Sequence, residues 1–310
     1  MNNLKKIGLT ALGTTLIASS AFAADFSVTG NASISMDQTD DKQGTAIYMG
    51  DSLNFKANGE MDNGVTVAVH YEIDGGALDD HSFTLGTSDM GSLRFGGHGD
   101  GTSLSSMDDK MPNAYEESFD IIDTDGAGKV GSPTVINGLS GNNSFKYTSA
   151  EMNGTTATVA YLHGSDYVDF GVTNSGSIDG LTVGYARGDV EDAADATKEA
   201  TESTLYAKYA IGSITAGYQI SDLDHPTAGT SLESKSMGVT YAISDNLSVG
   251  YHQHNLEKEN DADDQKSTGV SASYTMGSMT LGGASNKVEN MANTLGADHK
   301  GYEMTLSFAF

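Results

Sequence analysis

The chain has 310 residues, and its 42 Asp and Glu outnumber its 16 Lys and Arg, which gives a formal net charge of −26. This sign disfavours nucleic-acid binding, because that depends on cationic side chains placed against phosphates. The chain has no Cys, which excludes a disulfide framework, and it has no run of about 18 apolar residues that would form a membrane helix.

The first 23 residues have the three parts of a secretory signal peptide. Lys5 and Lys6 supply a positive start, residues 7–18 are mostly apolar, and residues 21–23 (Ala-Phe-Ala) have the small-x-small form of a cleavage site. The apolar run is too short to span a bilayer, which argues against an N-terminal anchor helix. We therefore predict that residues 1–23 are removed on export and that residues 24–310 form one domain.

After residue 23, polar and apolar residues alternate in sixteen short stretches. The side chains of a β-strand point alternately to two faces, so each stretch presents one apolar face and one polar face. The high Gly count of 38 and the low Pro count of 3 suit many strands joined by tight turns. The predicted strands are residues 25–36, 47–60, 64–74, 80–88, 92–98, 143–151, 154–163, 166–174, 180–188, 203–211, 213–222, 235–243, 246–257, 266–276, 278–288 and 299–310.

The last stretch shows this alternation over its whole length. Tyr302, Met304, Leu306, Phe308 and Phe310 share one face, and the intervening residues, which are mostly polar, share the other. If such strands close into a ring, their apolar faces meet lipid and their polar faces surround a lumen, as in a transmembrane β-barrel. A soluble sandwich shows the same alternation, so the connections between strands must decide.

The predicted connections fall into two classes. After even-numbered strands they are tight turns built from Asn, Asp, Gly and Ser. Short turns on one side and long loops on the other are typical of an outer-membrane barrel. We therefore predict an all-β, 16-stranded antiparallel transmembrane β-barrel with both mature ends on the short-turn side. The longer, acidic connections after odd-numbered strands are residues 37–46, 99–142, 189–202, 223–234, 258–265 and 289–298.

Residues 99–142 are the longest of these connections. A loop of this length is usually functional or disordered. Folded into the lumen it would narrow a pore, where a patch of carboxylates favours cations. The alternative is a solvated acidic loop without influence on flux. Its carboxylates are Asp100, Asp108, Asp109, Glu116, Glu117, Asp120, Asp123 and Asp125, opposed only by Lys110 and Lys129.

At this point the mature chain resembles the general bacterial porins, particularly the alphaproteobacterial kind. The phrases GSLRFGG before the long third loop, GLTVGYARGD, NLSVGYHQ and the terminal GYEMTLSFAF follow one another along a 16-strand frame. The resemblance implies a homotrimer of channels in the outer membrane of a Gram-negative bacterium, surrounded by lipid and lipopolysaccharide. It also implies that the third loop constricts each pore and that the outer-membrane assembly machinery reads the strand ending at Phe310.

Members of this family set a basic wall against the acidic third loop, and here the chain departs from the pattern. The wall candidates are Lys56, His70 and Arg94, each on the lumen parity of its predicted strand. The chain has only two Arg, Arg94 and Arg187. We therefore expect a field across the pore that is weak or dominated by its acidic side.

Two groups of residues suggest metal ions. Asp120, Asp123 and Asp125 offer calcium closely spaced oxygen ligands, but their spacing is not that of an EF-hand, and no Glu stands at the closing position. Loosely held calcium is the resulting expectation, with no resident cofactor. His252 and His254 share the lumen face of one predicted strand, but no third and fourth ligand accompanies them, so polar wall residues are the preferred interpretation.

No enzyme signature supports a catalytic role. Neither G-x-S-x-G nor H-E-x-x-H occurs, and no glycine-rich loop stands between a strand and a helix. We therefore predict passive diffusion of small hydrophilic solutes and ions, with a preference for cations. The alternatives are a structural or adhesive barrel with a plugged lumen and, third, an outer-membrane hydrolase.

Overall fold

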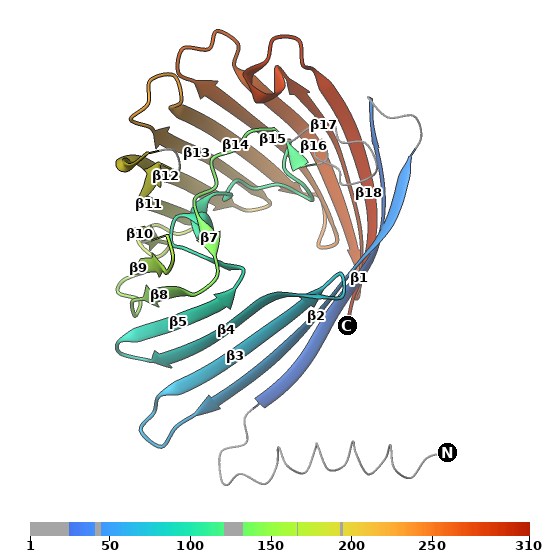
Figure 1. Cartoon of the computed structure of the whole chain (residues 1–310). Helices are drawn as coiled ribbons and strands as arrows, with labels where there is room; N and C mark the ends of the chain where they lie inside the picture. Colours follow the sequence, from blue (N-terminus) through green and yellow to red (C-terminus); the bar gives the residue numbers. More distant parts are fainter. Residues whose placement is uncertain (1–24, 41–44, 121–132, 166, 193–194) are drawn as a thin grey trace.

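The computed structural model describes residues 25–40, 45–120, 133–165, 167–192 and 195–310, and in these ranges it is a closed barrel of sixteen antiparallel strands (Figure 1). The predicted fold class is therefore confirmed, whereas the predicted signal peptide lies outside the described residues. The barrel strands are β1 (Asp25–Thr39), β2 (Ala46–Glu60), β3 (Thr66–Asp74), β4 (Ala77–Thr87), β5 (Gly91–His98), β8 (Ser144–Thr148), β9 (Thr155–Leu162), β10 (Tyr167–Asn174), β11 (Leu181–Asp192), β12 (Asp195–Ile211), β13 (Ile214–Asp224), β14 (Leu232–Ala242), β15 (Leu247–Lys258), β16 (Gln265–Met276), β17 (Met279–Glu289) and β18 (His299–Ala309).

The barrel closes where the first strand meets the last. β1 pairs with β18 from Asn31 opposite Ala309 to Thr39 opposite Gly301. The backbones of Gly30 and Phe310 exchange two further hydrogen bonds, of 2.8 and 3.0 Å. Since β1 begins and β18 ends at the same rim, both ends of the barrel lie on the short-turn side, as the sequence predicted. Closure leaves no strand of the ring with an unpaired edge, which a lipid environment requires.

The two faces of the sheet differ as the alternation predicts. In β18, Leu306 and Phe308 are 44% and 47% exposed on the outer face, whereas Thr305 is 7% exposed on the lumen side. The same division holds in β15, where Tyr251 faces outward and His252 is buried inside. Large apolar side chains therefore cover the outside, where they suit a hydrocarbon surrounding, and polar side chains line the lumen.

The sorting of loops by length is less complete than the sequence suggested. Residues 189–202 are not the predicted long loop, because β11 and β12 continue through most of them and pair Val190 with Ala200 and Glu191 with Glu199. Outside a membrane a strand needs no apolar face, so acidic residues can extend the ladder into water. On the same side, β3 and β4 are joined only by Gly75 and Gly76, whose positive φ angles of 54° and 81° fit a tight hairpin.

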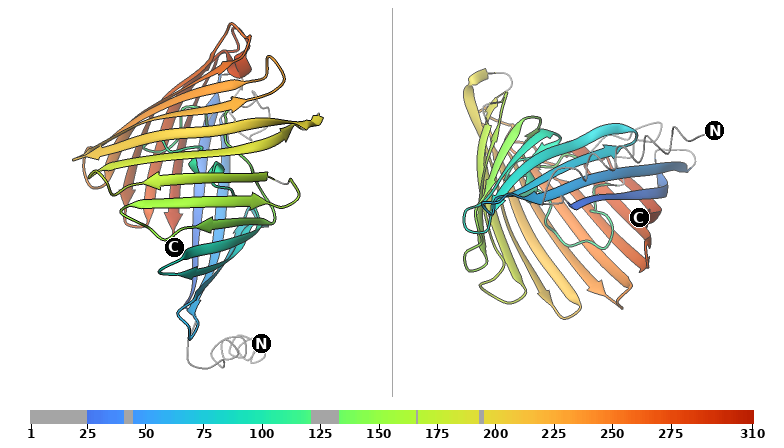
Figure 2. Two further views of the ribbon diagram at one scale, coloured as in Figure 1. Left: turned by 90° about the vertical axis from the view of Figure 1, so that its left-hand side faces the viewer. Right: turned by 90° about the horizontal axis from the view of Figure 1, so that it is seen from below.

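The connection after β5 enters the barrel. Its described residues include the short pair β6 (Asp100–Gly101) and β7 (Ser140–Gly141) and the 3-10 turn η1 (Ser105–Met107). Viewed from below, it lies within the ring of strands (Figure 2, right). The 3-10 turn η3 (Met291–Asn293) stands in the connection between β17 and β18. No helix of the described chain is long and apolar enough to cross a membrane.

Candidate functional site

The third loop begins its path along the inner wall at Asp169 of β10. This carboxylate is 1% exposed and accepts hydrogen bonds from the backbone N–H groups of Ser103 (3.0 Å) and Leu104 (2.7 Å). A buried carboxylate is costly unless donors satisfy it, so the loop backbone and Asp169 stabilise each other. The start of the loop is therefore fixed to the wall.

Gln219 of β13 holds the next part of the loop. Its Nε2 donates to the carbonyl oxygens of Met107 (2.8 Å) and Asp108 (2.9 Å), and its Oε1 accepts from the N–H of Lys110 (3.1 Å). A small apolar cluster reinforces this attachment, since Leu104, Met107 and Met111 of the loop are buried with Ala186 and Tyr206 of the wall.

Four further strands receive the loop on the far side of the lumen. Ser271 Oγ accepts from the N–H of Ala114 at 3.1 Å, and His252 Nδ1 accepts from that of Ser118 at 3.1 Å. Asn286 Nδ2 donates to the carbonyl of Glu117 at 2.6 Å, and the Tyr115 hydroxyl lies 2.6 Å from Thr305 Oγ1 and also donates to Glu303. Residues 103–118 of the loop therefore follow the wall from β10 round to β18.

Glycines on the lumen face give the loop its room. A Cβ atom at Gly238 would lie 2.2 Å from the carbonyl oxygen of Pro112, and one at Gly282 would lie 2.2 Å from the ring of Tyr115. Such distances are too short for any side chain, so only glycine permits this approach. The wall glycines that the loop contacts are Gly171, Gly217, Gly238, Gly250, Gly269 and Gly282.

Three of the predicted constriction carboxylates converge. Oxygen atoms of Glu116, Glu117 and Asp120 lie within 4.8 Å of one another. Burial, followed by the hydrogen bond to Asp120, raises the pKa of Glu116 to about 8 and that of Glu117 to about 10. At neutral pH this cluster therefore retains protons and carries less charge than its residue types suggest.

The other predicted loop carboxylates have different surroundings. Burial, followed by the charge of Asp109, raises the pKa of Asp108 to about 6. Burial also raises the pKa of Asp109. Asp100 is 5% exposed and stands apart from this group, because it lies beside Arg94 at the base of the loop. The structure therefore brings Asp100 to the basic wall and not to the acidic cluster.

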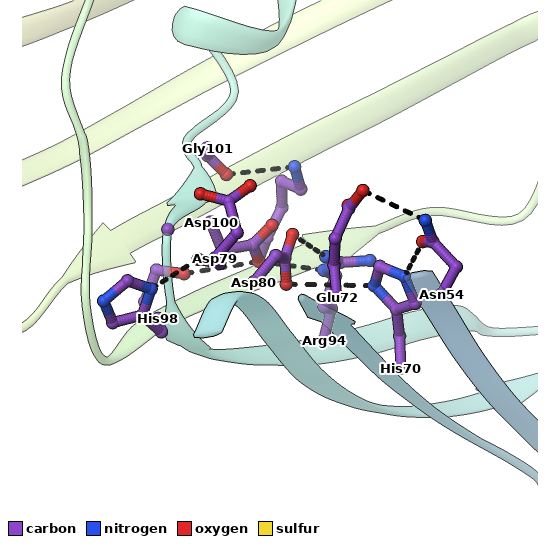
Figure 3. A network of polar contacts seen from close by, with 12 residues as sticks. Asn54, His70, Glu72, Asp79, Asp80, Arg94, His98, Asp100 and Gly101 are labelled. Atoms are coloured by element: carbon purple, nitrogen blue, oxygen red, sulfur yellow. Dashed lines mark hydrogen bonds and ion pairs between the residues drawn. The ribbon is translucent and has the colours of Figure 1, made fainter. Parts of the chain in front are cut away.

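The basic wall candidates Lys56, His70 and Arg94 lie together on the lumen side of β2, β3 and β5. Figure 3 shows His70 and Arg94 on either side of Asp80. Arg94 Nε is 2.8 Å from Asp100 Oδ2, and Arg94 Nη2 is 3.5 Å from Asp80 Oδ2. His70 Nδ1 is 3.8 Å from Asp80 Oδ1. Two carboxylates thus offset the charge of Arg94, which leaves Lys56 as the wall cation with no ion pair or side-chain hydrogen bond among the described residues.

Sequence reasoning missed several residues that build this site. Asp80 pairs with the wall cations, Lys146 of β8 donates to the carbonyl of Gly101 at 3.0 Å, and Asp169 and Gln219 hold the loop. All four lie on the lumen parity of their strands, which was the available signal. Parity shows which side chains face the lumen, but it does not show which of them contact one another. That depends on the register between neighbouring strands, which brings residues of different strands together.

The metal candidates have mixed outcomes. Asp123 and Asp125 lie outside the described residues, so calcium held by Asp120 with these two stays a prediction. His252 accepts a hydrogen bond from Ser118, and Phe119 packs edge-on against both His252 and His254, with ring centroids 5.8 and 5.3 Å away. Among the residues with described coordinates, the acidic cluster is the one group arranged to hold a metal, and it contains no His.

A closed barrel with an apolar outer face and a loop through its lumen defines an outer-membrane channel protein. A family model described as Gram-negative porin matches residues 8–266, so the chain belongs to the Gram-negative porin family and resides in the outer membrane. No curated protein matches the sequence.

Solved porins share the fold at low sequence identity. An anion-selective porin from Comamonas acidovorans is 12% identical with a TM-score of 0.69, and the match covers 93% of this chain and 100% of that one. OmpT of Vibrio cholerae in its trimer form is 14% identical with a TM-score of 0.66, covering 94% and 100%. A variant of the Rh. blastica porin is 14% identical with a TM-score of 0.65, covering 92% and 100%.

Proposed function

We propose that this porin passes small hydrophilic solutes and ions by passive diffusion, with the third loop as its size and charge filter. The observation that supports this proposal is the attachment of residues 103–118 to the lumen wall from β10 to β18. A loop held in this way narrows the lumen permanently. No energy source is needed, because solutes move down their own gradients.

The proposed preference is for cations. The loop carries five carboxylates between Asp108 and Asp120, and of the three wall candidates Lys56, His70 and Arg94 only Lys56 lacks an acidic partner among the described residues. Fixed charges act over about 10 Å at 0.1 M salt, so those at the narrow part of the lumen influence every passing ion. The protons retained by Glu116 and Glu117 weaken this preference at neutral pH without reversing it, because Asp108, with a pKa of about 6, is mostly ionised there.

Reversal potentials under a salt gradient in planar bilayers test the proposal. The wild type should prefer cations, and changing Asp108, Asp109, Glu116 and Glu117 together to their amides should weaken the preference without closing the channel. Lys56→Gln should strengthen it. An anion-selective wild type would refute the charge assignment, whereas no current after verified insertion would favour the plugged barrel. A hydrolase would require turnover of an ester or peptide substrate.

We also propose that the chain forms homotrimers through the side of the barrel that contains the short strands β9 and β10. β9 and β10 have eight residues each, whereas β12 has seventeen (Figure 2, left). At ~3.3 Å per residue and a tilt of about 40°, eight residues rise roughly 20 Å, less than the ~25 Å apolar band of such barrels. A neighbouring subunit would cover this shortfall, and the known trimer of Vibrio cholerae OmpT supports the stoichiometry.

The mass of the detergent-solubilised protein, measured by light scattering, should correspond to three chains. Val159→Cys on β9 should react slowly with a lipid-soluble maleimide in membranes, and Val239→Cys on β14 should react fast. Both valines are outward and similarly exposed in the single chain, at 49% and 43%, so they form a matched pair. A monomer mass, or equal labelling of the two, would count against this interface. Contacts with lipopolysaccharide and with the assembly machinery belong to the same proposal.

A further inference from the structure

A small cavity in the lumen wall lies apart from the acidic cluster. It has a volume of about 300 Å³ and opens among the inward side chains of β2, β3, β4 and β5. Cross-strand register explains its shape. Lys56, His70 and Ser82 form one row across the strands, and Asn58, Ala68, Thr84 and Arg94 form the next. The small side chains of Ala68, Ser82 and Thr84 make the floor, and longer side chains stand around it.

The cavity is rich in polar groups that nothing in the described protein satisfies. The side chains of Lys56, Asn58, Ser82 and Thr84 have no hydrogen bond or ion pair with any described residue. They provide an ammonium group, an amide and two hydroxyls on one small concave surface. Polar side chains that converge in a pocket without protein partners are typical of a site that fixes the orientation of a ligand.

Among the charged groups that line the cavity, Lys56 alone is available for a negative group on that ligand, and Asp80 Oδ1, which has no hydrogen-bond partner among the described residues, is available to accept from a hydroxyl. Arg94 is opposed by Asp80 and Asp100, and His70 faces Asp80 and bonds Asn54 Oδ1 at 2.6 Å (Figure 3). The unopposed cation is therefore Lys56. One ammonium suits a carboxylate better than a doubly charged phosphate, and the neighbouring hydroxyls and amide can pair with hydroxyl groups on the same molecule.

We infer that this wall cavity is a binding subsite for small hydroxycarboxylates that cross the lumen. The carboxylate pairs with Lys56, and the hydroxyl of the solute exchanges hydrogen bonds with Asn58, Ser82 or Thr84. The inference rests on the proposed diffusion function, because solutes reach the cavity through the lumen. Residence of a solute on the wall facing the loop raises its concentration at the narrow part of the path.

Glycolate is the probe, because it is the smallest molecule with both groups. Its binding is measured on the detergent-solubilised protein by ligand-observed NMR titration, with acetate, which lacks the hydroxyl, and ethylene glycol, which lacks the charge, as comparison solutes. Wild-type protein should bind glycolate more tightly than acetate and should not bind ethylene glycol. Equal binding of glycolate and acetate, or binding of the neutral diol, overturns the assignment.

Two variants and a matched control localise the binding. Lys56→Gln should weaken glycolate binding about tenfold, since a hydrogen bond to a charged group is lost. Ala68→Leu fills the floor and should weaken it similarly with Lys56 intact. Lys208→Gln on β12 removes another inward lysine at a similar distance from the short turns, on a different part of the wall, and should leave binding unchanged. Equal effects of Lys56→Gln and Lys208→Gln indicate a general field and refute the site.

Conductance of the same proteins in potassium chloride in planar bilayers separates this inference from the proposed function. If the protein binds glycolate but passes no current, the subsite is supported and the diffusion function is refuted. If the protein conducts but binds glycolate, acetate and ethylene glycol equally, the diffusion function is supported and the subsite is refuted. Melting temperatures in detergent identify a misfolded variant, and for Ala68→Leu the smaller change Ala68→Val then replaces it.

Discussion

At the residue scale, the loop carboxylates show how surroundings change the charge that a sequence suggests. Glu116, Glu117 and Asp120 share one small volume, and burial makes ionisation of Glu116 and Glu117 costly. The pKa of Glu116 is raised to about 8, whereas an exposed Glu has an ordinary value near 4.3. The charge of the filter therefore depends on pH across the neutral range.

Cation preference should accordingly rise with pH. Between pH 5 and pH 9, Asp108 loses its proton first, near its pKa of about 6, and Glu116 follows near its pKa of about 8. Each loss adds negative charge to the filter, so the reversal potential should move toward that of an ideal cation channel as pH increases. Carboxyls with ordinary pKa values would give a flat profile above pH 6.

The control for this profile is a carboxylate outside the loop. Glu116→Gln should remove the rise between pH 7 and pH 9, because the group that titrates there is gone. Asp245→Asn, in the turn between β14 and β15, should leave the rise in place. The measurement is the reversal potential in dilute salt, where screening is weakest. A wild-type profile without a rise would show that these carboxyls are ionised throughout.

At the scale of the element, the third loop is held by the wall more than by its own structure. Within residues 99–119 its regular elements are the two residues of β6 and the three of η1. Its position is instead set by side chains from β10, β13 and β15–β18. A loop of this kind is released by changing the barrel without changing the loop.

Gln219→Ala should loosen the loop while the barrel remains intact. It removes three hydrogen bonds to the loop backbone, and at about 1 kcal/mol each the attachment should lose roughly 3 kcal/mol. Hydrogen exchange at residues 107–111 should rise and open-channel current noise should increase, with an unchanged melting temperature. Gln253→Ala, on the outer face of β15 away from the loop, is the matched control. Equal exchange in the two variants would mean that Gln219 does not hold the loop.

The path of the loop, unlike the strands, could not be predicted from the sequence. The period-two alternation predicted the strands and their faces, because it depends only on neighbours along the chain. The signal for the path of the loop was also present, as inward glycines such as Gly217, Gly238 and Gly250 on successive strands. Without the register between strands, these glycines could not be recognised as one track. The pairing of Asp100 with Arg94 was hidden for the same reason, since it depends on how the loop turns after β5.

At the scale of the whole molecule, the ring of hydrogen bonds accounts for both stability and assembly. Phe310 contributes two backbone bonds to Gly30, and its ring covers Gly30 and stacks on Phe308 at 6.1 Å. These are few among the bonds of sixteen strands. The last residue therefore adds little to the folded state, although it lies at the seam that must form for the barrel to close.

Deleting Phe310 should reduce the amount of barrel inserted in cells, while protein refolded in detergent should melt within a few degrees of the wild type. Two backbone hydrogen bonds are worth about 2 kcal/mol, which is small for a barrel of this size. Phe310→Ala keeps the two backbone hydrogen bonds to Gly30 and removes the aromatic ring. It therefore distinguishes recognition of the ring during assembly from hydrogen bonding between β1 and the end of β18. Normal insertion of both variants would refute a role for Phe310 in assembly.

The closing pair of strands also imposes an order on how the molecule is made. β1 is synthesised first, yet one of its two partners, β18, is the last strand of the ring to be synthesised. Asn31 therefore pairs with Ala309, a residue separated from it by nearly the entire length of the chain. Contacts of such high sequence separation form slowly, since the entropy of closing the intervening loop is lost before any pairing is gained. Until then the chain has two open edges and many outward apolar side chains, both prone to aggregation. The ring therefore closes only after β18 has been synthesised, and until then the chain is at its most prone to aggregation.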